Sequence, residues 1–97
     1  MPIKIKPHVD LKLFEPKMYL VTIVYDKHVS WEFCVKILMG VFHWNEENAK
    51  AIAHEIVTNG EGICGGYMLE IAESKAELVE QQAKKEGFSL YCLVEEV

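Results

Sequence analysis

The chain has 97 residues, of which 51% are hydrophobic, and its formal net charge at pH 7 is -5. This length allows one small domain and excludes a complete Rossmann domain. All ten basic residues are lysines, and the acidic balance lacks the basic stripe of a nucleic-acid-binding protein. No apolar run could cross a bilayer and no secretory leader is present, so we expect a cytoplasmic monomer that binds neither nucleic acid nor membrane.

The three cysteines, Cys34, Cys64 and Cys92, are widely spaced and have apolar neighbours. An odd number at this spacing does not indicate a disulfide framework, and it favours small buried side chains in a reducing compartment. No CxxC or HxxxH pair accompanies them, so the spacing rules for zinc are not met. We therefore expect no metal and no cofactor.

The N-terminal segment over 1–17 contains all three prolines, which interrupt regular structure. We interpret it as a mobile N-terminal arm that precedes a folded core over 18–97; an edge strand within it is the alternative. The β-branched, apolar stretch over 18–25 predicts a buried strand. Ser30 is a suitable N-cap for a helix over 31–43, because its hydroxyl can accept an unpaired backbone N–H.

The second half of the chain predicts four further elements. Asn45 is the N-cap of a second helix, which ends at Gly60, where a left-handed residue is needed. Residues 62–69 predict a short strand, 70–87 a long exposed helix and 89–97 a final strand. The order β-α-α-β-α-β indicates an α+β fold, a single small domain with a three-stranded antiparallel sheet packed against three helices.

Helical periodicity selects the residues that these helices should bury. On the exposed side of the last helix, Glu80 and Lys84 are spaced for an i,i+4 ion pair. The predicted buried positions are Trp31, Phe33, Cys34, Ile37, Leu38, Val41, Phe42, Ala49, Ile52, Ala53, Ile56, Ile71, Ala72, Ala76, Val79 and Ala83.

The stretch NGEGICGG contains Gly60-x-Gly62-x-x-Gly65, the spacing of a dinucleotide-binding fingerprint. In that fingerprint a strand precedes the glycines and a helix begins on them. Here a predicted helix precedes them and a strand follows. We therefore interpret the glycines as structural, with Gly60 as a helix cap and Gly65 as a place of close backbone approach.

The same stretch, extended over 60–75 as GEGICGGYMLEIAESK, resembles the signature of the ClpS family, adaptors of the ATP-dependent Clp protease. That signature reads G-x-G-[VI]-C-G-V-Y-x-x-E-V-A-E-x-K. The segments EPKMYLVTIV, WEFCVKILMGVF and SLYCLVEEV resemble other family segments in the same order. The resemblance runs from about residue 15 to the C-terminus in one register.

The resemblance implies an adaptor rather than an enzyme. One face would dock on the N-terminal domain of the Clp unfoldase. A separate pocket would hold the first residue of substrates that begin with Leu, Phe, Tyr or Trp, the N-degrons. The arm over 1–17 would serve delivery. The unfoldase-contacting positions of the family correspond to Tyr67, Glu70, Glu73 and Lys75.

The implied substrate pocket departs from the family pattern at its polar positions. The usual Asn-Asp-Asp is Tyr25-Asp26-Lys27, and the histidine late in the second helix is Val57. Valine offers no acceptor to a substrate α-ammonium, and Lys27 adds a like charge, so binding an unpaired ammonium is costly. The hydroxyl or ring face of Tyr25 could still compensate in part.

The implied pocket walls also differ from the family pattern. Trp31 stands where the family has a gatekeeping methionine, and Ala53 replaces a second methionine. Cys34, Ile56 and Leu90 keep small or apolar walls. Trp31 either fills or reshapes the pocket, or is simply a core residue at a helix start.

Three functions follow as hypotheses. The favoured one is a Clp protease adaptor-like protein that docks on the unfoldase and modulates substrate choice, with altered or lost N-degron recognition. The alternatives are a functional N-degron adaptor whose α-amine site is rebuilt from Asp26 and Tyr25, and a non-Clp protein-interaction module on the same scaffold. An enzyme is disfavoured, because no nucleophile and base occur at a recognisable spacing.

Overall fold

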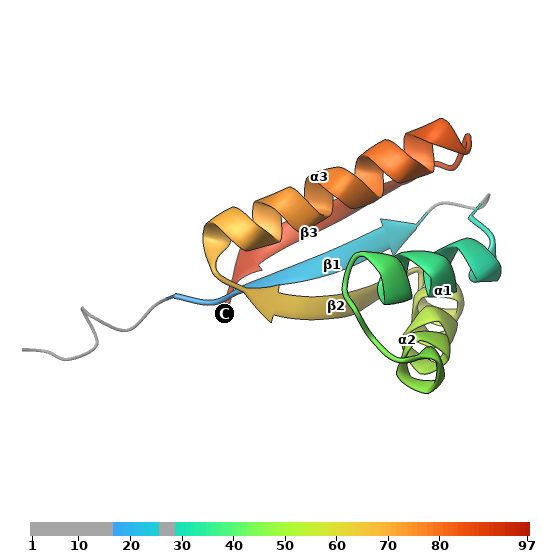
Figure 1. The fold of residues 1–97 in the computed structure, drawn as a ribbon, viewed down its shortest axis with the longest axis horizontal. Coiled ribbons are helices and arrows are strands. Elements are labelled where there is room, and N and C mark those ends of the chain that lie inside the picture. Colours follow the sequence, from blue (N-terminus) through green and yellow to red (C-terminus); the bar gives the residue numbers. More distant parts are fainter. Residues whose placement is uncertain (1–16, 26–28) are drawn as a thin grey trace, which may run out of the picture.

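The computed structural model describes residues 17–25 and 29–97 and confirms the predicted fold class and order of elements (Figure 1). All of the predicted arm except Lys17 lies outside the described residues, as do Asp26 and Lys27 of the predicted pocket. The elements are strand β1 (Tyr19–Tyr25), helix α1 (Trp31–Gly40), helix α2 (Glu46–Asn59), strand β2 (Glu61–Tyr67), helix α3 (Leu69–Lys85) and strand β3 (Leu90–Glu96).

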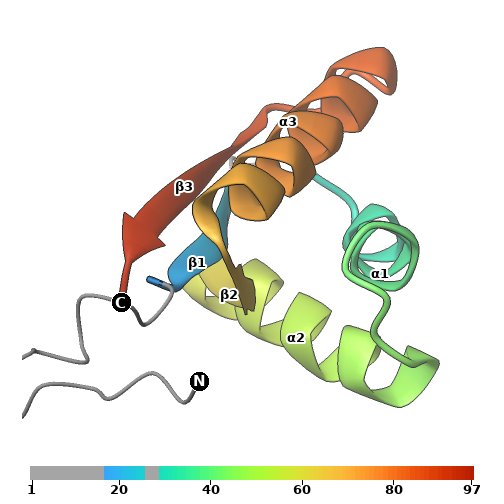
Figure 2. The same ribbon diagram turned by 60° about the vertical axis from the view of Figure 1, so that its left-hand side comes forward.

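The sheet places β1 in the centre, in the order β2-β1-β3, and both pairings are antiparallel. The side chains of Val21, Ile23 and Cys64 on one face are fully buried. This is the face that the helices cover: α2 packs over β2, α3 packs over β3, and α1 packs on α2 (Figure 2). The other face carries Ile63 and Tyr91, both exposed.

Helix α1 ends three residues earlier than the sequence predicts, at Gly40 rather than His43. The chain then turns, because His43 adopts a left-handed φ of 59° and the Trp44 N–H donates to the Leu38 carbonyl at 3.0 Å. Phe42 is nevertheless buried as predicted. It packs into the core from the connection between α1 and α2 rather than from a helical face.

Three predicted core positions are wrong or only partly right. Ile71 is 49% exposed and Trp31 37% exposed, while Ile52 is only half-buried. Both exposed residues lie in the first turn of a helix, and Ile71 is rotated about 100° around α3 from the buried Ala72. The stripe that α3 does bury consists mainly of alanines, which allow the helix to lie close to the sheet.

The predicted helix caps are confirmed. The Ser30 hydroxyl accepts from the Phe33 N–H at 3.1 Å, and Asn45 Oδ1 accepts from the Asn48 N–H at 2.8 Å. Gly60 ends α2 with a left-handed φ of 82°, a conformation that costs glycine little. The glycine stretch therefore follows a helix and builds strand β2, which is the reverse of a dinucleotide fingerprint.

Candidate docking face and substrate pocket

The ammonium of Lys75 lies between α3 and the connection that joins α1 to α2. Its Nζ donates to the Val41 carbonyl at 2.6 Å. The same nitrogen lies 5.0 Å from the centroid of the Tyr67 ring and 5.9 Å from that of Phe42. A carbonyl and two aromatic faces thus bind one cation in a half-buried place, where cation–π attraction is stronger than in open water.

Strand β2 is shaped to place Tyr67 beside this cation. The pairing with β1 shifts between Val21 and Thr22, so that Cys64 is an extra residue in a β-bulge. The Trp44 indole N–H donates to the Cys64 carbonyl at 2.7 Å and so ties the α1–α2 connection to the bulge. A Cβ on Gly65 would lie 2.6 Å from the Tyr67 hydroxyl, so this glycine makes room for the ring.

The Tyr67 ring stays neutral at physiological pH. Burial, and secondarily the neighbouring Cys64, raises the pKa of the Tyr67 hydroxyl. A neutral phenol keeps the ring face that attracts an ammonium. The centroids of Tyr67 and Phe42 are 6.3 Å apart, within the range of an aromatic pair.

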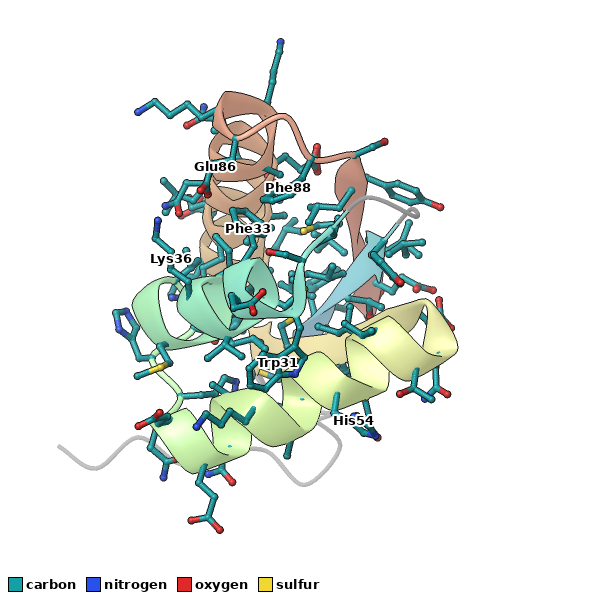
Figure 3. The ribbon with its side chains drawn as sticks, turned by 90° about the vertical axis from the view of Figure 1, so that its right-hand side faces the viewer. Trp31, Phe33, Lys36, His54, Glu86 and Phe88 are labelled. Carbon is teal, nitrogen blue, oxygen red and sulfur yellow. The ribbon has the colours of Figure 1, made fainter. Side chains whose placement is uncertain are left out.

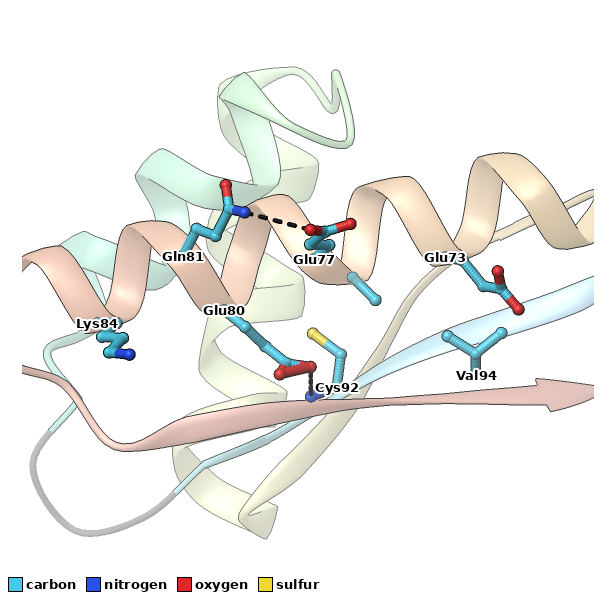
Figure 4. A pocket seen from close by; sticks show the side chains of 8 residues that line it. Glu73, Glu77, Glu80, Gln81, Lys84, Cys92 and Val94 are labelled. Atoms are coloured by element: carbon cyan, nitrogen blue, oxygen red, sulfur yellow. Dashed lines mark hydrogen bonds between the residues drawn. The ribbon is translucent and has the colours of Figure 1, made fainter.

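The structure brings together only part of the predicted unfoldase-binding set. Tyr67 and Lys75 are in contact, and Glu70 projects from the first turn of α3 with its side chain exposed. Glu73 lies toward β3, in a groove that it shares with Val94 (Figure 4). Because it precedes Lys75 by two residues, it falls on the other side of the helix.

Sequence reasoning missed the residues that hold Lys75. The sequence predicts Val41 and Phe42 as buried residues of the first helix; in the structure they are buried but lie, with Trp44, in the connection that holds Lys75 and the bulge. The only local signal was the Phe-His-Trp run between two helices, where an apolar loop indicates tertiary contacts. We call Tyr67, Lys75 and Phe42, together with the exposed Glu70 of the first turn of α3, the docking face.

The predicted substrate pocket divides into buried and accessible residues. Cys34, Ala53 and Ile56 have exposures of 1%, 0% and 0%, and belong to the core between α1, α2 and the sheet. Tyr25 and Leu90 pair across the adjacent ends of β1 and β3, and both are half-buried. Of the predicted pocket residues, three therefore belong to the core and two are half-buried at the strand ends.

Trp31 and Val57 are the other two described residues of the predicted substrate pocket that are not fully buried. Trp31 begins α1 and its indole lies between α1 and α2, whereas the His54 side chain is exposed on α2 away from it (Figure 3). Val57 is half-buried. The Tyr25 N–H donates to the Gly60 carbonyl at 2.9 Å, which fixes the end of β1 against the end of α2.

The thiols are weak acids in this environment. Burial raises the pKa of Cys34 to about 11 and that of Cys64 to about 12. Burial, with the nearby Glu80 carboxylate, raises the pKa of Cys92 to about 12. All three are free thiols, and within residues 17–25 and 29–97 no group of three or more His, Cys, Asp or Glu is placed to hold a metal ion.

These pKa values predict a loss of stability in alkali. Well below pH 9 the thiols are protonated in both states. As the pH rises through 9 they ionise first in the unfolded chain, so the free energy of unfolding should fall as pH rises toward 11. The slope is at most about 1.4 kcal/mol per pH unit for each thiol. Urea unfolding between pH 8 and 10.5 measures it. Cys64→Ala should show a shallower fall, and an equal slope in both proteins would contradict the prediction.

Comparison with known proteins gives a consistent result. A family model described as ATP-dependent Clp protease adaptor protein ClpS matches residues 14–93. The ClpS adapter protein of Campylobacter jejuni (strain RM1221) is 47% identical over 85 residues, 88% of each chain. That of Helicobacter hepaticus is 41% identical over 88 residues, 91% of this chain and 89% of the other. The structure of Agrobacterium tumefaciens ClpS2 bound to L-phenylalaninamide matches with a TM-score of 0.80 and 26% identity, covering 86% of this chain and 100% of that one.

The fold and these matches define the class as protease adaptors. More specifically, the chain belongs to the ClpS family, adaptors of the ATP-dependent Clp protease. The resemblance noted over 60–75 is thereby confirmed. In the part of the chain that the structure describes, no helix is long and apolar enough to span a bilayer.

Proposed function

We propose that this chain is a cytoplasmic Clp adaptor that docks on the N-terminal domain of a Clp unfoldase and modulates substrate choice, with altered or lost N-degron recognition. It has no catalytic activity of its own. The folded core over 18–97 carries both sites, and the segment over 1–17 acts as a delivery arm.

The docking role is supported by the way Lys75 is held. Its ammonium is fixed by the Val41 carbonyl and the Tyr67 ring, so little side-chain entropy is lost when a partner carboxylate approaches. Glu70 offers an exposed carboxylate on the same helix. A cation held at an aromatic ring and an exposed anion on the same helix suit a partner surface with complementary charges.

The proposal that N-degron recognition is altered or lost is supported by the chemistry of the described pocket residues. A bound α-ammonium needs acceptors, because leaving it unpaired costs several kcal/mol. Among the described pocket residues, the Tyr25 hydroxyl is the one side-chain oxygen. Val57 supplies none, and the Trp31 indole N–H is a donor.

A second function is favoured by one specific observation. The ClpS2 to which this chain is similar is bound to L-phenylalaninamide, which has a free α-amine and an aromatic side chain. A functional N-degron adaptor would therefore use the Tyr25 hydroxyl and Asp26 to bind the amine in the same fold.

Binding of labelled peptides tests the two functions directly. Peptides that begin with Leu, Phe, Tyr or Trp would be titrated with the α-amine free and acetylated, alongside the isolated unfoldase N-terminal domain. The proposal expects binding of the domain and binding to free-amine peptides no tighter than to acetylated ones. Micromolar binding that acetylation removes would establish the second function instead. Absence of domain binding would refute docking in both.

Restoring the family's polar residues gives the converse test. The triple variant Tyr25→Asn, Lys27→Asp, Val57→His should bind free-amine peptides at least about tenfold more tightly than the unmodified protein, because acceptors and a negative charge return. Unchanged affinity would assign the altered recognition to Trp31 and not to the polar residues.

A further inference from the structure

Strand β3 lies at an edge of the described sheet, with β1 on one side of it. The Val97 N–H donates to the Met18 carbonyl at 2.9 Å, on the β1 side, whereas the Cys92 N–H donates to Glu80 Oε1 at 3.4 Å, on the outer side. In an antiparallel ladder alternate residues direct their backbone groups in opposite directions. The backbone groups of Cys92 and Val94 therefore point to the outer edge.

Helix α3 forms an acidic wall along this edge. A groove of about 520 Å³ runs between the helix and the strand (Figure 4). Glu73, Glu77 and Glu80 line it from above, at the i, i+4 and i+7 positions of one helical stripe, and Lys84 lies at one end. The floor is the edge of β3, where Cys92 and Val94 lie. The groove thus combines an extended row of backbone groups with negative charge.

Glu80 occupies the place that a neighbouring strand would take. Its carboxylate accepts from the Cys92 N–H instead of pairing with Lys84, which corrects the predicted ion pair. The bond is long and exposed, so exchanging it for a backbone carbonyl costs little. A carboxylate released in this way would be ready to pair with a cation.

We propose that the β3 edge and the acidic stripe of α3 bind an extended segment of another protein that carries lysine or arginine at alternate positions. The segment adds to the sheet as a strand next to β3. Its carbonyls accept from the Cys92 and Val94 N–H groups, and its cations pair with Glu77 and Glu80. Backbone pairing supplies the affinity and the charges supply the selection. This inference does not rest on the proposed function, because the groove lies across α3 from Lys75.

Three short labelled peptides provide the probes. The first alternates lysine and threonine; the second has the same sequence with N-methylated amides on its pairing edge; the third replaces lysine with glutamate. We expect the first to bind, and each of the others to bind at least about tenfold more weakly. Equal binding of the methylated peptide would overturn the proposal, because strand pairing would not be involved.

Amide hydrogen exchange locates the bound segment. The lysine peptide should slow exchange at Cys92 and Val94, and leave Tyr91 and Leu93, which already face β1, unchanged. If the peptide binds without slowing exchange at Cys92 and Val94, it is held by charge attraction and not by strand pairing, and the proposal is overturned.

A charge variant on the stripe completes the test. The double variant Glu77→Gln, Glu80→Gln should bind the lysine peptide about tenfold more weakly at low salt, since two exposed ion pairs are lost. Glu55→Gln on α2 is the matched control and should bind it normally. The unmodified protein, the double variant and the control should all bind the unfoldase domain equally. A failure of the peptide-binding proposal can therefore be distinguished from a failure of the docking proposal. Unweakened peptide binding by the double variant would contradict the assigned site.

Discussion

Replacing Ile56 with alanine should lower the free energy of unfolding by about 2–5 kcal/mol, one of the largest effects we expect in this domain. The side chain is fully buried and packs from α2 against strand β2. Its removal leaves a cavity that the neighbouring backbone cannot fill. Urea unfolding followed by circular dichroism measures the change. Ile71→Ala, at a site that is 49% exposed, is the control and should change stability by less than about 0.5 kcal/mol.

The neighbour of Ile56 makes this prediction sharper. A Cβ on Gly62 would lie 2.6 Å from Ile56 Cγ1, so Gly62→Ala alone should cost about 1–3 kcal/mol through overpacking. In the Ile56→Ala background the added methyl has space, and its cost should largely disappear. A double-mutant cycle measures this coupling. Simple additivity of the two changes would show that the contact is not what excludes a side chain at Gly62.

Replacing Lys75 with methionine should both destabilise the fold and weaken unfoldase binding. Methionine keeps most of the unbranched apolar stem but loses the hydrogen bond to the Val41 carbonyl and the attraction to the Tyr67 ring. The loss of a charged hydrogen bond predicts about 1.5–3 kcal/mol of destabilisation. Thermal unfolding and titration with the unfoldase N-terminal domain measure the two effects separately.

The Glu70→Gln variant, in the same two measurements, distinguishes an effect on unfoldase binding from an effect on stability. The side chain is exposed, so stability should change by less than about 0.5 kcal/mol, yet binding of the domain should weaken. Normal binding by both variants would remove these residues from the docking face. Wild-type stability of Lys75→Met would show that the ammonium contributes nothing to the fold.

Local signals made most of the fold predictable. Ser30, Asn45 and Gly60 mark helix ends through interactions with residues three or four positions away, and all three do so in the structure. The β-branched run over 18–25 forms the central strand, which pairs with a strand on each side and buries Val21 and Ile23. Such features depend on short-range chemistry, which a sequence displays directly.

The details of the site depend on long-range contacts, which the sequence does not display. Lys75 donates a hydrogen bond to Val41, 34 residues away in the sequence, and Glu80 accepts one from Cys92, 12 residues away. Helical periodicity predicts the buried side of α3 but not the width of the buried stripe, so the prediction that Ile71 is buried is wrong. The resemblance implies a contact role for both Glu73 and Lys75, and a spacing of two residues places their side chains on nearly opposite sides of α3.

The central position of β1 has a consequence for how the domain is made. The ribosome synthesises β1 before its two partners, and β3 is the last of the six described elements to emerge. At about 5–20 residues per second, β1 waits several seconds with its backbone and apolar side chains unpaired. We therefore expect the sheet to form only after β3 has emerged, and the β1 segment to be open to chaperones during that interval.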